Sequence, residues 1–321
     1  MRVLLVQADG KLPNLALMKL SAYHKAQGDT AGFHTSNPDI VYVSCIFSKN
    51  VARARGVAKF YPDARFEIGG PGLGVEGKAL PDEVEHVMPD YSLYGIDYSI
   101  GFSSRGCIRK CPFCQVMKVE GAFREHAPIE EFLHPDHRKL LFFDNNFLAS
   151  DLWREKLDYI REKGVKVSFT QGLDARLVDD EVAEALERTA SFNTHFTYGT
   201  YYFAWDFIHD EKEILRGLRR MIEAGVVASR VIVYMLVGYN TSHQEDVYRF
   251  RKLVELGMEP FVMIFNNRMD DRWLRDFARY VNKWFYRTVK FEKYKKGALV
   301  EVGLGAESNL HRRNMTAKTN E

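Results

Sequence analysis

The sequence has few cysteines, almost no net charge and no long hydrophobic run. Its four cysteines do not suggest a disulfide framework, because three of them lie within Cys107–Cys114. The formal net charge of +2 gives no global reason to expect a nucleic acid or a membrane surface as partner. The longest apolar run, Val231–Val237, is far too short to cross a bilayer. The first residues, MRVLLVQADG, lack the layout of a signal peptide, so we expect a cytoplasmic protein with reduced thiols.

Enough apolar residues are present for a sizeable core. Hydrophobic residues make up 46% of the 321 residues and charged residues 27%, which is typical of a globular protein. This length allows two domains, or one barrel with an appendage.

Residues 1–85 alternate between strand and helix patterns. Ile40–Phe47 is a nearly continuous apolar run, as expected of a parallel strand that is covered on both faces. The alternation predicts a Rossmann-like (flavodoxin-like) α/β domain that is truncated relative to a complete one. Its predicted strands and helices are Arg2–Gln7, Asn14–Ala26, Ile40–Phe47, Val51–Phe60 and Arg65–Ile68.

A glycine-rich run, Gly69–Gly74, follows the last of these strands. Its spacing does not fit the G-x-G-x-x-G pattern of a dinucleotide loop, and it follows a late strand rather than the first one. We therefore favour a backbone turn that needs positive φ angles and a close approach of neighbouring backbone.

Three cysteines, Cys107, Cys111 and Cys114, form a C-x3-C-x2-C pattern after a strand-like run and Gly106. Thiolates at this spacing can share one centre only if the chain loops around it. Iron–sulfur clusters are bound by cysteine thiolates, usually four for a [4Fe–4S] centre. Three ligands on one loop would leave one iron open, as a catalytic metal site keeps a position for substrate.

This pattern, with Phe113 just before the last cysteine, resembles the signature of the radical S-adenosylmethionine (radical SAM) superfamily. The resemblance implies a [4Fe–4S] cluster whose open iron is chelated by S-adenosylmethionine. It also implies a one-electron donor such as flavodoxin or ferredoxin, and a 5′-deoxyadenosyl radical that abstracts hydrogen from a substrate. Phe113 would shield the cluster beside the adenine. The alternative is a zinc site, for which His126 is the nearest downstream ligand.

From Tyr98 onward, strand and helix patterns alternate, which implies right-handed crossovers and a parallel sheet. Six such units fit the partial (β/α)6 TIM-like barrel that the resemblance implies for residues 86–290, followed by a partly disordered C-terminal extension, residues 291–321. The predicted strands are Tyr98–Ser103, Lys139–Phe143, Lys166–Thr170, one within Phe196–Trp205, Arg230–Val237 and Phe261–Phe265. The predicted helices are Leu152–Lys163, Glu181–Arg188, Glu211–Ala224, Gln244–Leu256 and Asp271–Trp284.

An α/β domain before the cluster resembles the cobalamin-binding (B12-binding-like) domain of one radical SAM subgroup. The D-x-H-x-x-G motif that supplies a histidine to cobalt is absent, because after Asp9 the next histidine is His24. We therefore do not expect cobalamin to bind, and a cobalamin-dependent radical methyltransferase is an alternative reading.

Polar residues follow the predicted barrel strands, where ligands of parallel α/β proteins bind. Asp144, Asn145 and Asn146 follow the second strand, where the resemblance implies contacts to the amino group of S-adenosylmethionine, usually from Gly-Gly-Glu. They could instead cap the next helix. After the third strand, Gln171 could bind ribose hydroxyls and Arg176 a carboxylate. The alternative for Arg176 is a surface ion pair with Asp174.

Two further positions follow the fifth strand. Gly238 and Asn240 lie where the resemblance implies packing against adenine, or they belong to a helix cap. In the fourth strand region Tyr198, Tyr202 and Trp205 shape a pocket or, more commonly, fill the core. No catalytic residue beyond the cysteines can be named.

The substrate is not predicted beyond a small molecule, a nucleoside or a peptide. Cys45 is the one cysteine outside the motif, and it is more easily explained as a small buried apolar residue than as a redox partner. Arg105, Arg109 and Lys110 would stabilise the thiolates. The third functional alternative is a non-catalytic metal-binding or nucleic-acid-binding module with zinc at the three cysteines.

Overall fold

The computed structural model of the protein describes residues 1–77 and 79–294. Within them the chain forms two compact units, one of Met1–Phe203 with Glu213–Val231 and one of Ala204–Lys212 with the described residues from Ile232 onward. The predicted division at residues 85 and 290 stays a prediction. The predicted disorder at the C-terminal end falls on residues outside the described part. In the described ranges no helix is both long and apolar enough to span a membrane.

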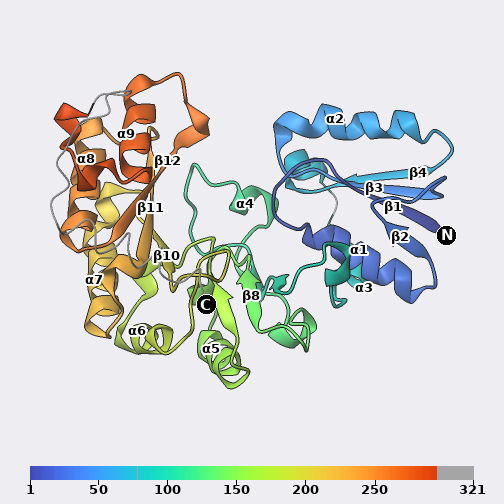
Figure 1. The fold of residues 1–321 in the computed structure, drawn as a ribbon, viewed down its shortest axis with the longest axis horizontal. Coiled ribbons are helices and arrows are strands. Elements are labelled where there is room, and N and C mark those ends of the chain that lie inside the picture. Colours follow the sequence, from blue (N-terminus) through green and yellow to red (C-terminus); the bar gives the residue numbers. More distant parts are fainter. Residues whose placement is uncertain (78, 295–321) are drawn as a thin grey trace, which may run out of the picture. The chain divides into compact units, whose positions relative to one another are not determined.

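The fold is mixed α/β with parallel sheets, as predicted. The first sheet has the strand order β2-β1-β3-β4 with every pair parallel (Figure 1). Thr30–Gly32 is the one strand of this sheet that the sequence pattern did not predict. Its elements are β1 (Arg2–Gln7), α1 (Leu15–Ala26), β2 (Thr30–Gly32), β3 (Ile40–Ser44), α2 (Val51–Gly56), β4 (Arg65–Gly69) and α3 (Asp82–Glu85).

The helices α1 and α2 lie on opposite faces of this sheet (Figure 1), and alternate side chains of β1 pack toward each of them. Val3 and Leu5 of β1 pack in one cluster with Leu17 of α1. Leu4, between them, packs in another cluster with Ala54 of α2. Because both faces are covered, the strands are apolar at consecutive positions, which is what made them recognisable.

The glycine run forms a tight turn, η3 (Pro71–Glu76), directly after β4. Gly70 has φ +107°, and a Cβ there would lie 2.5 Å from the carbonyl oxygen of Cys45. At Gly72 a Cβ would lie 2.8 Å from the same oxygen. Both glycines are therefore needed for close backbone approach, as the turn interpretation requires.

A second parallel sheet in the same unit has the order β5-β8-β9. It shares a hydrophobic cluster with α1 through Met18, Ile100 and Leu141, which joins the two sheets into one unit. The elements of this part are β5 (Ser99–Gly101), β8 (Lys139–Phe142), α5 (Trp153–Glu162), β9 (Lys166–Ser168), α6 (Asp180–Glu187) and α7 (Glu211–Glu223). The strand β10 (Tyr201–Ala204) belongs to another sheet, of order β10-β11-β12.

In the second unit β11 (Val231–Val237) and β12 (Glu259–Ile264) pair in parallel, and α8 (His243–Glu255) and α9 (Arg272–Asn282) complete the βα alternation. The fully buried Arg249 of α8 donates hydrogen bonds to the Trp205 and Leu236 carbonyl oxygens and to the Asp246 carboxylate. The predicted strands and helices are thus present. A continuous six-stranded barrel stays a prediction.

The close approach of α7 to neighbouring backbone in the first unit can be tested at Gly217. An alanine normally stabilises a helix relative to glycine, but a Cβ at Gly217 would lie 1.8 Å from the carbonyl oxygen of Ala175. We therefore expect Gly217→Ala to lower the free energy of unfolding by about 1 kcal/mol, measured by urea denaturation. The matched control is Gly56→Ala, because a Cβ there meets nothing within 4 Å. Equal effects of the two substitutions would contradict the packing of α7.

Candidate functional site

The three motif cysteines lie on the loop of a β-hairpin. Its strands, β6 (Ser104–Arg105) and β7 (Arg124–Glu125), pair antiparallel, and a further bridge joins Cys107 to Ala122. Gly106 allows this closure, because it has φ +72° and a Cβ there would lie 2.2 Å from the Ala122 carbonyl oxygen. The cysteines therefore lie on a long loop, including α4 (Val116–Val119), that is closed at its base.

All three thiols of the loop are half-buried and therefore accessible in part. Cys107 Sγ accepts hydrogen bonds from the backbone N–H of Arg109 at 3.3 Å and from Asn146 Nδ2 at 3.8 Å. The backbone N–H of Cys114 donates to the Cys111 carbonyl oxygen at 3.0 Å. Over residues 1–77 and 79–294, no three His, Cys, Asp or Glu side chains are gathered closely enough to hold a single metal ion.

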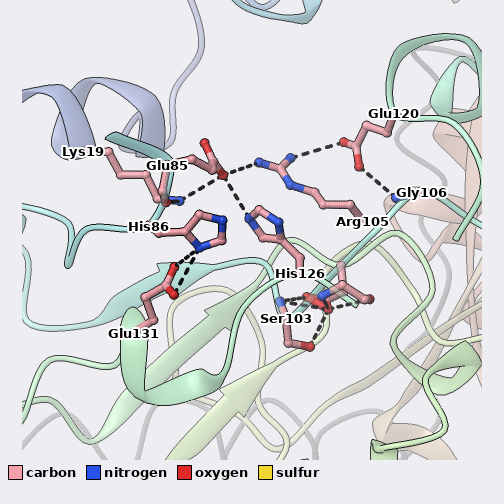
Figure 2. Close-up of polar contacts among 11 residues, drawn as sticks. Lys19, Glu85, His86, Ser103, Arg105, Gly106, Glu120, His126 and Glu131 are labelled. Atoms are coloured by element: carbon pink, nitrogen blue, oxygen red, sulfur yellow. Dashed lines mark hydrogen bonds and ion pairs between the residues drawn. The ribbon is translucent and has the colours of Figure 1, made fainter. Parts of the chain in front are cut away.

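Asp144 holds the segment that leads into the hairpin. Its carboxylate is buried and accepts hydrogen bonds from the backbone N–H groups of Ser103 and Ser104, both at 2.8 Å. The two serine hydroxyls donate to it as well, at 2.7 and 2.9 Å (Figure 2, in which Ser103 is labelled). Burial raises the pKa of Asp144, and the hydrogen bonds from Ser103 and Ser104 act against that rise.

Glu120 ties the two ends of the cysteine loop together. Its Oε2 accepts hydrogen bonds from the Gly106 backbone N–H at 3.1 Å and from Asn145 Nδ2 at 2.9 Å. Its Oε1 lies 3.5 Å from Arg105 Nη1 (Figure 2). The loop is therefore closed by a carboxylate at its C-terminal end as well as by the hairpin.

Asp174 anchors the loop from the third strand's carboxyl end. Its buried carboxylate accepts hydrogen bonds from Arg109 Nε at 2.8 Å and Arg176 Nε at 2.7 Å, and Asn146 Nδ2 lies 3.4 Å away. Burial raises the pKa of Asp174, but the hydrogen bonds and charges of the two arginines outweigh burial, and the net pKa is lowered. The Asp174–Arg176 ion pair, the alternative to a ligand-binding role of Arg176, is thus present, and the predicted binding of ligands by Arg176 and by the exposed Gln171 stays a prediction.

A second ionic group lies on the other side of Arg105, centred on the carboxylate of Glu85. Glu85 Oε1 lies 3.0 Å from Lys19 Nζ, from Arg105 Nη2 and from His126 Nε2 (Figure 2). Only 6% of the Lys19 side chain and 15% of the Glu85 side chain are exposed. Burial raises the pKa of Glu85, but the hydrogen bond from His126 and the charges of Lys19 and Arg105 outweigh it and hold the pKa well below its usual range.

This ionic group connects the first sheet's helix α1 to the cysteine loop, because Lys19 belongs to α1 and Arg105 to β6. Beside it, His86 Nδ1 lies 2.9 Å from Glu131 Oε1, and the His86 and His126 rings lie 5.3 Å apart. The Arg105 guanidinium also lies 3.5 Å from the centre of the Phe102 ring. Sequence reasoning predicted the charge of Arg105 but neither of its partners, Glu85 and Glu120.

The remaining predicted positions are placed as follows. Phe113 is half-buried on the loop. Gly238 follows β11 in the second unit with φ +75°, and Asn240 is exposed. Their contact with a cofactor stays a prediction. Cys45 is fully buried, and burial raises the pKa of its thiol, in keeping with a small apolar role.

The aromatic residues of the fourth strand region divide between core and surface. Tyr202 and Trp205 are buried, whereas Tyr198 is 54% exposed. Trp205 Nε1 donates a hydrogen bond to the Phe207 carbonyl oxygen at 2.9 Å. The interpretation that these aromatic residues fill the core therefore applies to Tyr202 and Trp205 but not to Tyr198.

Comparisons with known proteins give a likeness to solved structures alone. No protein-family model matches the chain. No curated protein matches it either. Among solved structures it is similar to coproporphyrinogen III oxidase from Escherichia coli, described as a radical SAM enzyme, with a TM-score of 0.35 and 11% identity. The match covers 57% of this chain and 47% of that one, and it does not assign the chain to a family.

Asp144 gives the first test of the site. We expect Asp144→Ala to lower the free energy of unfolding by about 2 kcal/mol, because it leaves buried N–H and O–H donors of Ser103 and Ser104 without an acceptor. Urea denaturation of the metal-free protein measures this. Asp151→Ala, at an exposed position of the same connection, is the matched control and should change stability by no more than about 0.5 kcal/mol. A loss in the control as large as in Asp144→Ala would contradict the role of the buried carboxylate.

Proposed function

We propose that the protein is a radical SAM enzyme with a [4Fe–4S] cluster at Cys107, Cys111 and Cys114. One observation carries the proposal: three half-buried thiols share a loop that is closed at its base and held at the carboxyl edge of a parallel sheet. Ligands of parallel α/β proteins bind at this edge. When bound, the cluster supplies one electron that cleaves S-adenosylmethionine to methionine and a 5′-deoxyadenosyl radical, which takes a hydrogen atom from the substrate.

The chain's own residues fit such a cluster. Three thiolates are the ligand set that leaves one iron open, and two N–H donors already point at Cys107 Sγ. The exposed Lys110 lies on the loop and offsets part of the negative charge that three thiolates bring, whereas Arg105 and Arg109 are already ion-paired with carboxylates.

Residues around the loop are proposed to share two tasks. Asp144 holds the loop, because its carboxylate already accepts four hydrogen bonds from Ser103 and Ser104. The sequence prediction also placed Asp144 among the contacts to S-adenosylmethionine. The other predicted contacts are kept as proposed ones: Phe113, Asn145, Asn146, Gln171, Arg176, Gly238 and Asn240. The donor of the electron is proposed to be a flavodoxin or ferredoxin, and the substrate a small molecule, nucleoside or peptide.

Cobalamin is not part of the proposal. The N-terminal sheet instead contacts the cysteine loop through the Lys19–Glu85–Arg105 group. This contact gives the truncated domain a supporting role that needs no cofactor of its own.

Metal analysis and electron paramagnetic resonance test the proposal together. Protein purified and reconstituted without oxygen should hold about four iron and four sulfide ions per chain, as a [4Fe–4S] centre requires. After reduction its resonance signal should change when S-adenosylmethionine is added, because the open iron gains a ligand. Zinc without iron and sulfide would contradict the proposal and favour a non-catalytic metal module.

A further inference from the structure

The side chain of Asn146 touches the cysteine loop at a sulfur atom. It follows β8 and is 3% exposed, so water does not compete for its amide. Its Nδ2 lies 3.8 Å from Cys107 Sγ and 3.4 Å from Asp174 Oδ2. Its Oδ1 is buried and has no hydrogen-bond partner among the described residues.

These contacts fix which end of the amide faces the sulfur. The Asp174 carboxylate accepts hydrogen bonds but cannot donate, and its low pKa keeps it ionised. An amide oxygen facing this carboxylate would be repelled, whereas an amide N–H is attracted. Asn146 Oδ1 makes no competing hydrogen bond among the described residues. The acceptors of the Nδ2 group, Cys107 Sγ and Asp174 Oδ2, therefore determine how the Asn146 amide is oriented.

Asp174 is itself held in place from the loop. Arg109, two residues after Cys107, donates from Nε to Asp174 and from its backbone N–H to Cys107 Sγ. Arg176 donates to the other carboxylate oxygen. The Cys107 sulfur, the Asn146 amide and the Asp174 carboxylate are therefore linked by hydrogen bonds. Asp174, held by Arg109, orients the Asn146 amide toward the sulfur.

We propose that Asn146 is a positioning residue that raises the reduction potential of the cluster through an N–H···S hydrogen bond to Cys107, oriented by Asp174. This inference rests on the proposed function. Reduction adds negative charge to a cluster that three thiolates already make negative. A hydrogen bond to a thiolate stabilises the reduced state more than the oxidised state, and hydrogen bonds to the sulfurs are among the factors that set the potential of such clusters.

Potentiometric titration of the reconstituted protein tests this inference, with the resonance signal of the reduced cluster as readout and no S-adenosylmethionine present. Asn146→Ala and Asn146→Leu both remove the N–H donor, the second with little change of volume. Both should shift the midpoint potential to more negative values while iron and sulfide content stay at the wild-type level. Asn50→Ala is the control, because the Asn50 amide donates to the Asp9 carboxylate near the first sheet and not to a cysteine of the loop.

Three results would overturn the inference. The first is an unchanged potential in both Asn146 variants, and the second is an equal shift in Asn50→Ala. The third is loss of the cluster from both Asn146 variants, which would mean that Asn146 is needed to hold the cluster. Absence of iron and sulfide from the wild-type protein is a different outcome, because it contradicts the proposed function itself.

Discussion

Replacing Cys107, Cys111 or Cys114 by serine, one at a time, should abolish both cluster binding and formation of 5′-deoxyadenosine. Each substitution removes one of only three thiolates on the loop, and a serine hydroxyl is a far poorer ligand for iron. Iron and sulfide content of anaerobically reconstituted protein measures the first effect. Chromatographic assay after reduction with dithionite in the presence of S-adenosylmethionine measures the second.

Cys45→Ser is the matched control for these variants. Cys45 is fully buried in the N-terminal sheet, in a cluster with Val43 and Ala54 rather than on the cysteine loop. The Cys45→Ser variant should therefore keep the iron and sulfide content of the wild-type protein. Loss of iron from this variant would show that the ligand set assigned to the cluster is wrong.

Glu85→Gln should lower the free energy of unfolding by about 3 kcal/mol, the second large effect that we expect. The substitution keeps the size of the side chain and removes its charge. Lys19, which is almost fully buried, then loses its partner, and Arg105 loses one of its two carboxylates. Urea denaturation of the metal-free protein at neutral pH measures the loss.

The Glu85 effect should also depend on pH in a defined direction. The pKa of Glu85 is lowered in the folded protein, so its stabilising contribution is complete above the unfolded-state pKa of about 4.3. The contribution shrinks as the pH falls below that value, because Glu85 of the unfolded chain takes up a proton first, and it is lost completely only as the pH falls through the lower pKa of the folded state. The difference in the free energy of unfolding between wild type and Glu85→Gln should therefore shrink as the pH falls from about 5 toward about 3, roughly one unit on either side of that pKa.

The neighbouring pair of His86 and Glu131 provides the control for Glu85. The His86 side chain is 42% exposed, so its ion pair with Glu131 is screened by water. Glu131→Gln should cost less than about 1 kcal/mol. Equal losses in Glu85→Gln and Glu131→Gln would contradict the central place of Glu85 in the ionic group.

Regular elements were predictable from the sequence because burial leaves a periodic pattern. β1 was predicted with its observed bounds, since Val3, Leu4 and Leu5 are all buried between two helix layers. The βα alternation after Tyr98 was recognisable for the same reason. The short strand Thr30–Gly32 was missed, because none of its residues is buried.

The hairpin that carries the cysteines left no such pattern. Its strands, β6 and β7, have only two residues each and are mostly polar, so no alternation can be read from them. Its closing contacts join residues that are distant in sequence: Glu120 meets Asn145, and Arg105 meets Glu85. Side chains that pair across such distances carry no local signal.

The polar residues after the second and third strands were found by position but not by role. The rule that ligands bind at the carboxyl ends of parallel strands led to Asp144, Asn145, Asn146 and Arg176. The structure shows the two asparagines contacting the cysteine loop and Asp144 holding the segment that leads into the hairpin. It shows Arg176 paired with Asp174. Position along a strand cannot distinguish a residue that holds a cofactor from one that holds the loop.

Cleavage of S-adenosylmethionine by the wild-type protein tests the central claim most directly. The reconstituted protein would be incubated without oxygen with dithionite and S-adenosylmethionine, and the nucleoside product quantified. The account predicts 5′-deoxyadenosine and methionine in equal amounts, with none formed by Cys111→Ser. An intact iron–sulfur cluster in the wild-type protein without any 5′-deoxyadenosine would contradict it.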